Sequence, residues 1–305
     1  MPKEMIVDPE KLSQRGELKF ASIKLHDYSK SFEEERARHG DNALKDVLRH
    51  MLIIREFESM LGSFKATGAY QGIPFIYRGP AHLSIGQEGA AVGAALGLEP
   101  EDHIFGSHRS HGEFLAKGLA SIQKLDEHAV NAMMADHQDG ALHDTVQRFI
   151  GGTGKSLAEN FLLFGLLAEI FMRSNGFNGG MGGSMHAFFP PVGAYPNNAI
   201  VGASAGIATG AALRKKLNGE TGICVANAGD GSTGCGPVWE AMNFASMAQF
   251  TTLWDETKRG GLPVLFFLTI ISTQWEVRPL ARPWHGIAFR GLEQRSMQTQ
   301  CMPRP

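Results

Sequence analysis

The spacing of apolar residues predicts helices along much of the chain. Over residues 41–65, apolar side chains recur at helical spacing and would share one helix face. These side chains are Leu44, Val47, Leu48, Met51, Leu52 and Ile54. The patterns of the later segments predict further helices over residues 84–96, 113–170, 198–217 and 237–250.

Short apolar runs predict strands between these helices. They cover residues 102–106, 222–228 and 262–268. Because helices alternate with the strands, the pattern predicts an α/β fold built on a parallel sheet. The glycine-rich residues 175–189 are expected to form a loop. The polar, weakly patterned residues 1–40 are expected to form an N-terminal extension packed on the surface.

Composition and charge narrow the classes of function. The 305 residues are 43% hydrophobic, and the net charge is −2 with no long run of Lys or Arg, so no nucleic-acid surface is expected. The cysteines form no CxxC pair, which disfavours a zinc site or a disulfide framework. The longest apolar run, 161–171, is too short to span a bilayer and contains Glu169. Since the N-terminus also lacks an apolar signal core, we expect a cytoplasmic protein with no membrane partner.

The most informative segment is a glycine-flanked aspartate, Gly229-Asp230-Gly231, at the end of a predicted strand. A carboxylate in this position can hold a hard cation such as Mg²⁺. The glycines let a diphosphate approach the backbone. The next helix, with Pro237 near its first turn, points its positive end toward that anion.

The same segment also satisfies the dinucleotide pattern GxGxxG through Gly229, Gly231 and Gly234, which would indicate a nicotinamide-dependent dehydrogenase. Two features disfavour that interpretation. Asp230 would face a pyrophosphate without a cation between them. No convincing acidic residue closes a second strand about 20 residues later. Taken alone, the segment favours a third interpretation, a glycine turn with a capping aspartate.

Ordered segments along the chain resemble the α-subunit of the E1 component of thiamine-diphosphate-dependent 2-oxo acid dehydrogenases. Besides the Gly-Asp-Gly segment they are AHLSIGQEGAAVGAAL (81–96), SHRSHGEFLAKGL (107–119), NGGMGGSMHAFF (178–189), IVGASAGIATGAAL (200–213) and EAMNFA (240–245). The resemblance covers residues 45–267. It implies the family's thiamine-diphosphate-binding α/β fold, as a domain over residues 41–268 with an insertion at 123–160.

The resemblance implies a role for each matching position at the cofactor. Asp230 would ligate Mg²⁺, and its neighbours Gly229, Gly231 and Ser232 would lie by the diphosphate. Arg109 would bind phosphate through paired hydrogen bonds. His108 stands beside it where the family usually has Tyr, so this position departs from the pattern. Two further positions, Gly202 and Ala205, match residues whose backbone contacts the aminopyrimidine ring.

Two histidines match active-site positions of the family. His82 and His111 would lie near the thiazolium ring and the substrate as catalytic residues. The alternative for each is a structural histidine with satisfied hydrogen bonds. A third histidine, His186, is expected to help fix the glycine-rich loop.

The activity implied by the resemblance is oxidative decarboxylation of a 2-oxo acid with transfer of the acyl group to a lipoyl-bearing E2 partner. In this family the glutamate that activates the cofactor comes from an E1 β-subunit, separate or fused. The chain alone would therefore not form a complete site. Pyruvate, branched-chain 2-oxo acids and acetoin all stay open as substrates.

The resemblance stops at Leu268. The family pattern has an Asn-Asn pair directly after the strand, where this chain reads Leu268-Thr269-Ile270-Ile271, and residues 269–305 form a tail unlike the family. A coding sequence for the family-like peptide NNNFYAMGGQT, read one base out of frame, can encode Thr269 to Pro279. We therefore expect a frameshift after residue 267, a fold incomplete at its C-terminus and an inactive chain. A non-catalytic fragment is thus the alternative to a working subunit.

One further motif is expected to carry no function. GGTGKS (151–156) is similar to a phosphate-binding loop, but that pattern needs glycine where Phe149 stands. No strong apolar strand precedes it, so a helix-breaking surface loop is expected.

Overall fold

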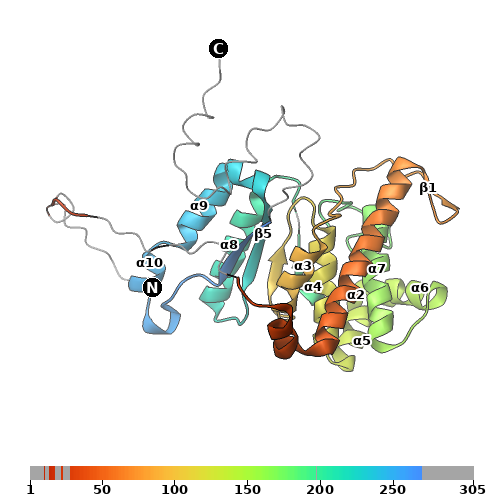
Figure 1. Cartoon of the computed structure of the whole chain (residues 1–305), viewed down its shortest axis with the longest axis horizontal. Helices are drawn as coiled ribbons and strands as arrows, with labels where there is room; N and C mark the ends of the chain where they lie inside the picture. The colour runs from red at the N-terminus through yellow and green to blue at the C-terminus, as the bar shows by residue number, and fades with distance from the viewer. Residues whose placement is uncertain (1–9, 11–13, 18–21, 23–27, 197, 270–305) are drawn as a thin grey trace, which may run out of the picture.

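The computed structural model describes residues 10, 14–17, 22, 28–196 and 198–269 (Figure 1). The tail beyond Thr269 and most of the predicted N-terminal extension lie outside the described residues.

A four-stranded parallel sheet organises the described chain. Its strand order is β4 (Ala194–Tyr195), β3 (His103–Phe105), β5 (Cys224–Gly229) and β6 (Val264–Thr269). Every neighbouring pair of strands in it is parallel. The predicted α/β class and parallel sheet are confirmed, and each predicted strand is present. The two-residue strand β4 was not predicted.

Side chains of the central strands alternate between two apolar layers. Ile104 and Val225 belong to the main core, whereas Phe105, Cys224 and Ala226 belong to the second. This alternation follows from the period-2 geometry of a strand. It explains why β5 is buried along its first five residues and reads as a continuous run of small and apolar residues.

Helices cover both faces of the sheet. Figure 1 shows α8 (Ala203–Asn218) and α9 (Gly236–Ala245) on one side of β5. On the other side lie α3 (Glu88–Leu96), α4 (His111–Lys124) and the long α2 (Phe32–Ala66). Beyond them lie α5 (Glu127–Asp136), α6 (Ala141–Phe149) and α7 (Gly154–Ile170), with the hairpin of β1 (Ala69–Tyr70) and β2 (Ile73–Pro74) at one end of α2.

Helix α2 begins nine residues before the predicted start, inside the predicted extension. Ser31 caps it: its hydroxyl accepts from Glu34 N at 3.3 Å, and the Glu34 carboxylate accepts from Ser31 N at 2.6 Å. This reciprocal pair is a capping box. Gly40, at φ +79°, kinks the helix near the point where the apolar pattern starts. The boundary predicted at residue 40 therefore marks a kink.

Local turns also delay two predicted helices. Helix α3 begins at Glu88 because a turn bonds Gln87 N to Ser84 O at 3.0 Å. Helix α8 begins at Ala203, directly after Gly202 adopts a left-handed φ of +87°. Near the C-terminal end, α9 stops at Ala245 and a short α10 (Gln249–Thr252) follows, where one continuous helix was predicted.

The segment predicted to be an insertion, residues 123–160, folds into helices that pack on the rest of the domain. Its buried residues Val130, Met134, Leu142 and Val146 join the main core. Within the described residues, no helix is both long and apolar enough to cross a bilayer.

Candidate active site

Two groups of predicted site residues lie at the carboxyl edge of the sheet. Because the strands are parallel, they end on the same edge, where α/β proteins bind ligands. Strand β3 ends at Phe105 and leads into Ser107–Arg109, and β5 ends at Gly229 and leads into Asp230. The predicted position of Asp230 at the end of a parallel strand is confirmed.

Asp230 opens a tight turn with free space beside its glycines. The turn is a 3-10 helix, Asp230–Gly234, in which Thr233 donates its hydroxyl to Asp230 O at 2.7 Å. Asp230 keeps 7% of its surface exposed. A Cβ added at Gly229, Gly231 or Gly234 would meet no described atom within 4 Å. A ligand could therefore approach this backbone closely.

Gly202 packs against the same turn, 30 residues earlier in the chain. A Cβ there would lie 3.0 Å from Val238 Cγ2, 3.2 Å from Cys235 Cβ and 3.6 Å from Ser232 O. The structure thus brings the predicted residues Gly202 and Ser232 together. Ala205 is fully buried; its N–H bonds Gly202 O at 3.3 Å and its carbonyl accepts from Thr209 at 2.8 Å. Its backbone is engaged within α8, so its cofactor contact stays a prediction.

His82, His108 and Arg109 form a second group at this edge. The rings of His82 and His108 meet edge to face, with centroids 5.6 Å apart. Arg109 donates to Leu83 O at 3.3 Å, next to His82. Burial, and then the positive charge of Arg109, lower the pKa of His82, which favours its neutral form. No described residue bonds the buried Nδ1 of His82.

His111 lies deeper, in a network that holds several segments together. Its Nδ1 lies 2.8 Å from Glu58 Oε1, and its Nε2 lies 2.9 Å from Ser184 Oγ and 3.0 Å from Ser184 O. The other Glu58 oxygen accepts from Ser84 N at 2.9 Å. His111 is 1% exposed and Glu58 is fully buried. Although this is the geometry of a Ser-His-Glu triad, its burial favours a structural role, so the predicted catalytic role of His111 stays untested.

A buried carboxylate fastens the glycine-rich loop. Glu169 accepts from the backbone N–H of Asn178 at 2.8 Å and of Gly180 at 2.9 Å, and also from Gly182 and Gly183. It is fully buried. Bonds of this kind offset the cost of burying a charge. A Cβ at Gly182 would fall 2.9 Å from Glu169 Oε1, so the glycine is required for this approach.

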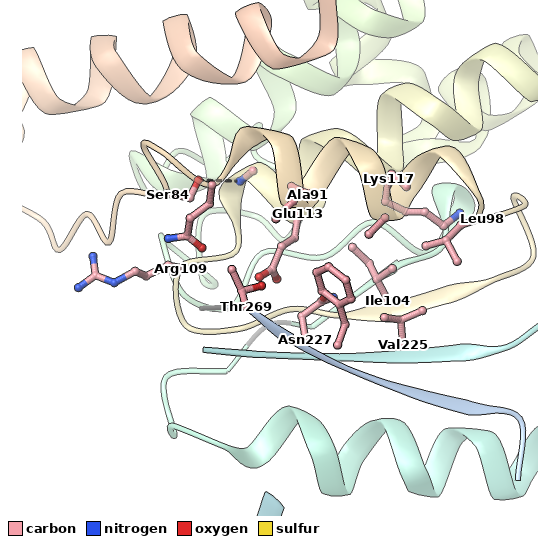
Figure 2. A pocket seen from close by; sticks show the side chains of 16 residues that line it. Ser84, Ala91, Leu98, Ile104, Arg109, Glu113, Lys117, Val225, Asn227 and Thr269 are labelled. Carbon is pink, nitrogen blue, oxygen red and sulfur yellow. Dashed lines mark hydrogen bonds between the residues drawn. The ribbon is translucent and has the colours of Figure 1, made fainter. Parts of the chain in front are cut away.

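A narrow cavity lies between the α3–α4 layer and the sheet (Figure 2). At about 20 Å³ it has room for about one water molecule. Figure 2 shows Glu113 reaching from α4 toward Thr269 and Asn227, while Arg109 points away from it. Burial raises the pKa of Glu113 to about 7 and lowers that of Lys117, at the far end, to about 8. The lining residue Gln87 has a buried Nε2 that no described residue bonds.

Sequence reasoning missed the carboxylates that position these groups. Glu58, Glu113 and Glu169 each lie in a helix and bond a partner in another segment. A signal existed for Glu169, an acidic residue inside an apolar run. Such a residue needs hydrogen-bond donors when the helix is buried, but the sequence does not say which donors.

The GGTGKS segment, predicted to be a helix-breaking surface loop, separates α6 from α7 over residues 151–153 and continues as the first turn of α7. Thr153 and Ser156 form a capping box at the start of α7. Lys155 donates to Gln123 O at 2.6 Å, so its amine serves the fold.

The residues around Asp230 fit a magnesium-bound diphosphate. The described residues contain no group of three or more His, Cys, Asp or Glu that could hold a metal by itself. Mg²⁺ does not need such a cage, because one or two carboxylates and substrate phosphates commonly bind it. No described atom lies within 4 Å of the Cβ positions of the glycines beside Asp230, which agrees with an approach by phosphates, and Arg109 at the same edge carries a guanidinium group, a group that suits phosphate geometry.

Comparison with known proteins gives one family. The profile described as "Dehydrogenase E1 component" matches residues 76–168 and 158–254, together more than half of the chain. These matches include the His82, Arg109, Gly202 and Asp230 positions.

Curated relatives agree with this match. The chain is 30% identical over 232 residues to the pyruvate dehydrogenase E1 component subunit alpha of Zymomonas mobilis, covering 75% of this chain and 48% of that protein. The somatic mitochondrial form of Homo sapiens is 30% identical over 228 residues, covering 74% and 45%. The Rickettsia bellii subunit is 26% identical over 262 residues, covering 83% and 62%. The chain spans about half the length of the curated relatives it matches.

Proposed function

This chain belongs to the dehydrogenase E1 component family, and from that premise we propose that it is an α-type subunit of a 2-oxo acid dehydrogenase. Its proposed ligands are thiamine diphosphate and Mg²⁺. The observation that carries the proposal is the placement of Asp230 at the carboxyl end of β5, beside glycines whose Cβ positions meet no described atom within 4 Å. The pyruvate dehydrogenase names of the relatives favour pyruvate among the candidate substrates.

Each part of the edge has a proposed task. Asp230 ligates Mg²⁺, and the backbone of Gly231 and Ser232 faces the diphosphate. Arg109 pairs with phosphate oxygens through its guanidinium group. His82, held neutral by burial and by Arg109, accepts or donates a proton near the substrate.

The bound cofactor supplies an electron sink for decarboxylation. An E1 β-subunit completes the site, and a lipoyl-bearing E2 accepts the acyl group. These partners follow from the family and rest on the proposed function. The cytoplasm is the proposed compartment.

A non-catalytic form of the same subunit is the second candidate. Gly229 and Thr269 are register partners, so β6 ends at Thr269 beside the strand residue that precedes Asp230. The chain reads Thr269-Ile270 where the family pattern has its asparagine ligand, so the amide oxygen that would bind Mg²⁺ is replaced. Aliphatic side chains supply no oxygen ligand to Mg²⁺.

Cofactor titration separates these proposals from the nicotinamide alternative. Calorimetry of the chain mixed with an E1 β-subunit should detect Mg²⁺-dependent binding of thiamine diphosphate. This binding should be weak if the non-catalytic proposal is correct. NAD should not bind. Thiamine diphosphate binding together with decarboxylation of pyruvate would support a working subunit. NAD binding without any thiamine diphosphate binding would overturn both proposals.

A further inference from the structure

The backbone that carries His108 and Arg109 is held by one carboxylate. Glu113 Oε2 accepts from Ser107 N at 2.8 Å, and Glu113 Oε1 accepts from the Ser107 hydroxyl at 2.8 Å. The Ser107 hydroxyl in turn accepts from Arg109 N at 3.3 Å. Glu113 therefore binds both donors of Ser107 directly, and it reaches the backbone amide of Arg109 through the Ser107 hydroxyl.

This arrangement differs from ordinary helix capping. Glu113 is the third residue of α4, the position from which a glutamate in a capping box bonds the N-cap backbone. Here the N-cap is Ser110, and its side chain makes no capping bond. Glu113 reaches past it to Ser107. Its carboxylate thus serves the segment between β3 and α4.

The element that presents Glu113 is itself fixed. Two residues earlier in α4, His111 bonds Glu58 of α2 at 2.8 Å. Gly112 N donates to Ser84 Oγ at 3.1 Å, which ties the same turn to the loop before α3. The Glu113 carboxylate therefore projects from a helix start that is anchored on two sides.

We propose that Glu113 is a positioning residue for the proposed cofactor site: through Ser107 it sets the backbone from which His108 and Arg109 reach a phosphate ligand. The part of this inference that concerns the ligand rests on the proposed function, whereas the clamp itself does not. Hydrogen bonds to an ionised carboxylate are stronger than neutral ones, and two parallel bonds also fix orientation. Holding the backbone in advance lowers the entropy that Arg109 loses on binding a phosphate.

Burial and hydrogen bonding shift the pKa of Glu113 in opposite directions. Burial raises the pKa of Glu113 to about 7, while the two bonds from Ser107 lower it. The bonds thus favour the ionised carboxylate, which accepts them best.

The test compares variants by two independent measurements. Glu113→Ala removes both acceptors, Ser107→Ala removes the hydroxyl link to Arg109, and Glu113→Gln keeps the shape and one carbonyl acceptor. Glu127→Ala, in the first turn of α5 and exposed, is the matched control. Hydrogen exchange by mass spectrometry reports on residues 104–112. Calorimetry reports on thiamine diphosphate affinity with Mg²⁺ and an E1 β-subunit.

We expect amide exchange in residues 107–109 to accelerate at least about tenfold in Glu113→Ala, the effect of losing a charge-assisted hydrogen bond. Ser107→Ala should accelerate exchange at Arg109, Glu113→Gln should change it less, and Glu127→Ala should leave it unchanged. Cofactor affinity should fall most in Glu113→Ala, less in Glu113→Gln and not at all in Glu127→Ala. Unchanged exchange in both Glu113→Ala and Ser107→Ala would overturn the clamp.

The ligand measurement separates the two proposals. If the exchange results hold but no form binds thiamine diphosphate, the clamp stands and the proposed function fails. If the unaltered chain binds the cofactor and Glu113→Ala binds it equally well, the positioning role is overturned. Recovery of affinity by Glu113→Gln relative to Glu113→Ala would mark the role as one of positioning.

Discussion

Thr269 pairs with Gly229 at the carboxyl ends of β6 and β5. Asp230 follows Gly229 directly, so the two strands end together at the predicted metal-binding carboxylate. In a parallel sheet this is where side chains from neighbouring strands can share one ligand. The asparagines expected from the family would follow from this end of β6. The sequence there bears directly on whether the chain can bind its cofactor.

The backbone conformation of Gly202 predicts a stability cost for any side chain. Gly202→Ala would place a Cβ at φ +87° and 3.0 Å from Val238 Cγ2. We expect the free energy of unfolding to fall by about 1–3 kcal/mol, measured by urea titration.

Gly206 provides the matched control, because it lies in the same helix with no described atom within 4 Å of its Cβ position. Gly206→Ala should stabilise the protein by about 0.5–1 kcal/mol through helix propensity. Equal effects of the two substitutions would contradict the placement of Gly202 at the helix start.

Glu169 is predicted to hold the glycine-rich loop closed. Glu169→Ala leaves the N–H groups of residues 178–183 without their acceptor, and we expect a loss of about 2–4 kcal/mol. Limited proteolysis should then cut within residues 175–189. Glu159→Gln, in the same helix and paired with Arg49, should cost less than about 1 kcal/mol and leave the loop protected. A protease-resistant loop in Glu169→Ala would argue against this anchor.

The two predicted catalytic histidines should behave differently. His111→Ala removes a buried ring bonded to Glu58 and Ser184, and we expect a stability loss of about 2–4 kcal/mol. His82→Ala breaks no bond between Nδ1 and a described residue and should cost less than about 1 kcal/mol, while reducing decarboxylation by a working form about a hundredfold. Full activity in a folded His82→Ala variant would remove His82 from the proposed mechanism.

The fold class and most elements could be predicted from the sequence because local patterns specify them. The apolar spacing of 41–65 and the short apolar runs ending at Ala228 and Leu268 could each be recognised from neighbouring residues alone. Strand β4 could not be predicted, because two residues carry no period and its pairing with Ile104 and Phe105 is tertiary. Helix starts were missed where a turn such as Ser84–Gln87 overrides propensity.

The candidate site was predictable only in part. Asp230 and Gly202 carry glycine signatures that the structure explains by a tight turn and a left-handed φ. The supporting carboxylates were not predictable. Glu58 lies 53 positions from its partner His111, and an isolated glutamate in a helix does not indicate which distant donor it meets.

His103 predicts a measurable pH dependence of stability. Burial, and then the charges of Lys215 and Lys117, lower its pKa from 6.5 to about 4. Between pH 6.5 and about pH 4, the folded chain therefore binds fewer protons at His103 than the unfolded chain. The free energy of unfolding is highest above pH 6.5 and decreases as the pH falls toward about 4. His103→Gln should remove about 2 kcal/mol of the loss between about pH 7 and about pH 4. Thermal unfolding across this range is the measurement, and identical slopes for both proteins would refute it.

The central claim is that Asp230 anchors a magnesium-bound thiamine diphosphate in an E1 α-type subunit. Calorimetric titration of the cofactor, with an E1 β-subunit present, tests it on three forms: the unaltered chain, a form carrying Thr269→Asn, Ile270→Asn and Ile271→Asn, and that form with Asp230→Ala. We predict Mg²⁺-dependent binding by the asparagine form, at least about tenfold weaker binding by the unaltered chain, and none after Asp230→Ala. Unchanged cofactor affinity in the Asp230→Ala form would contradict the account.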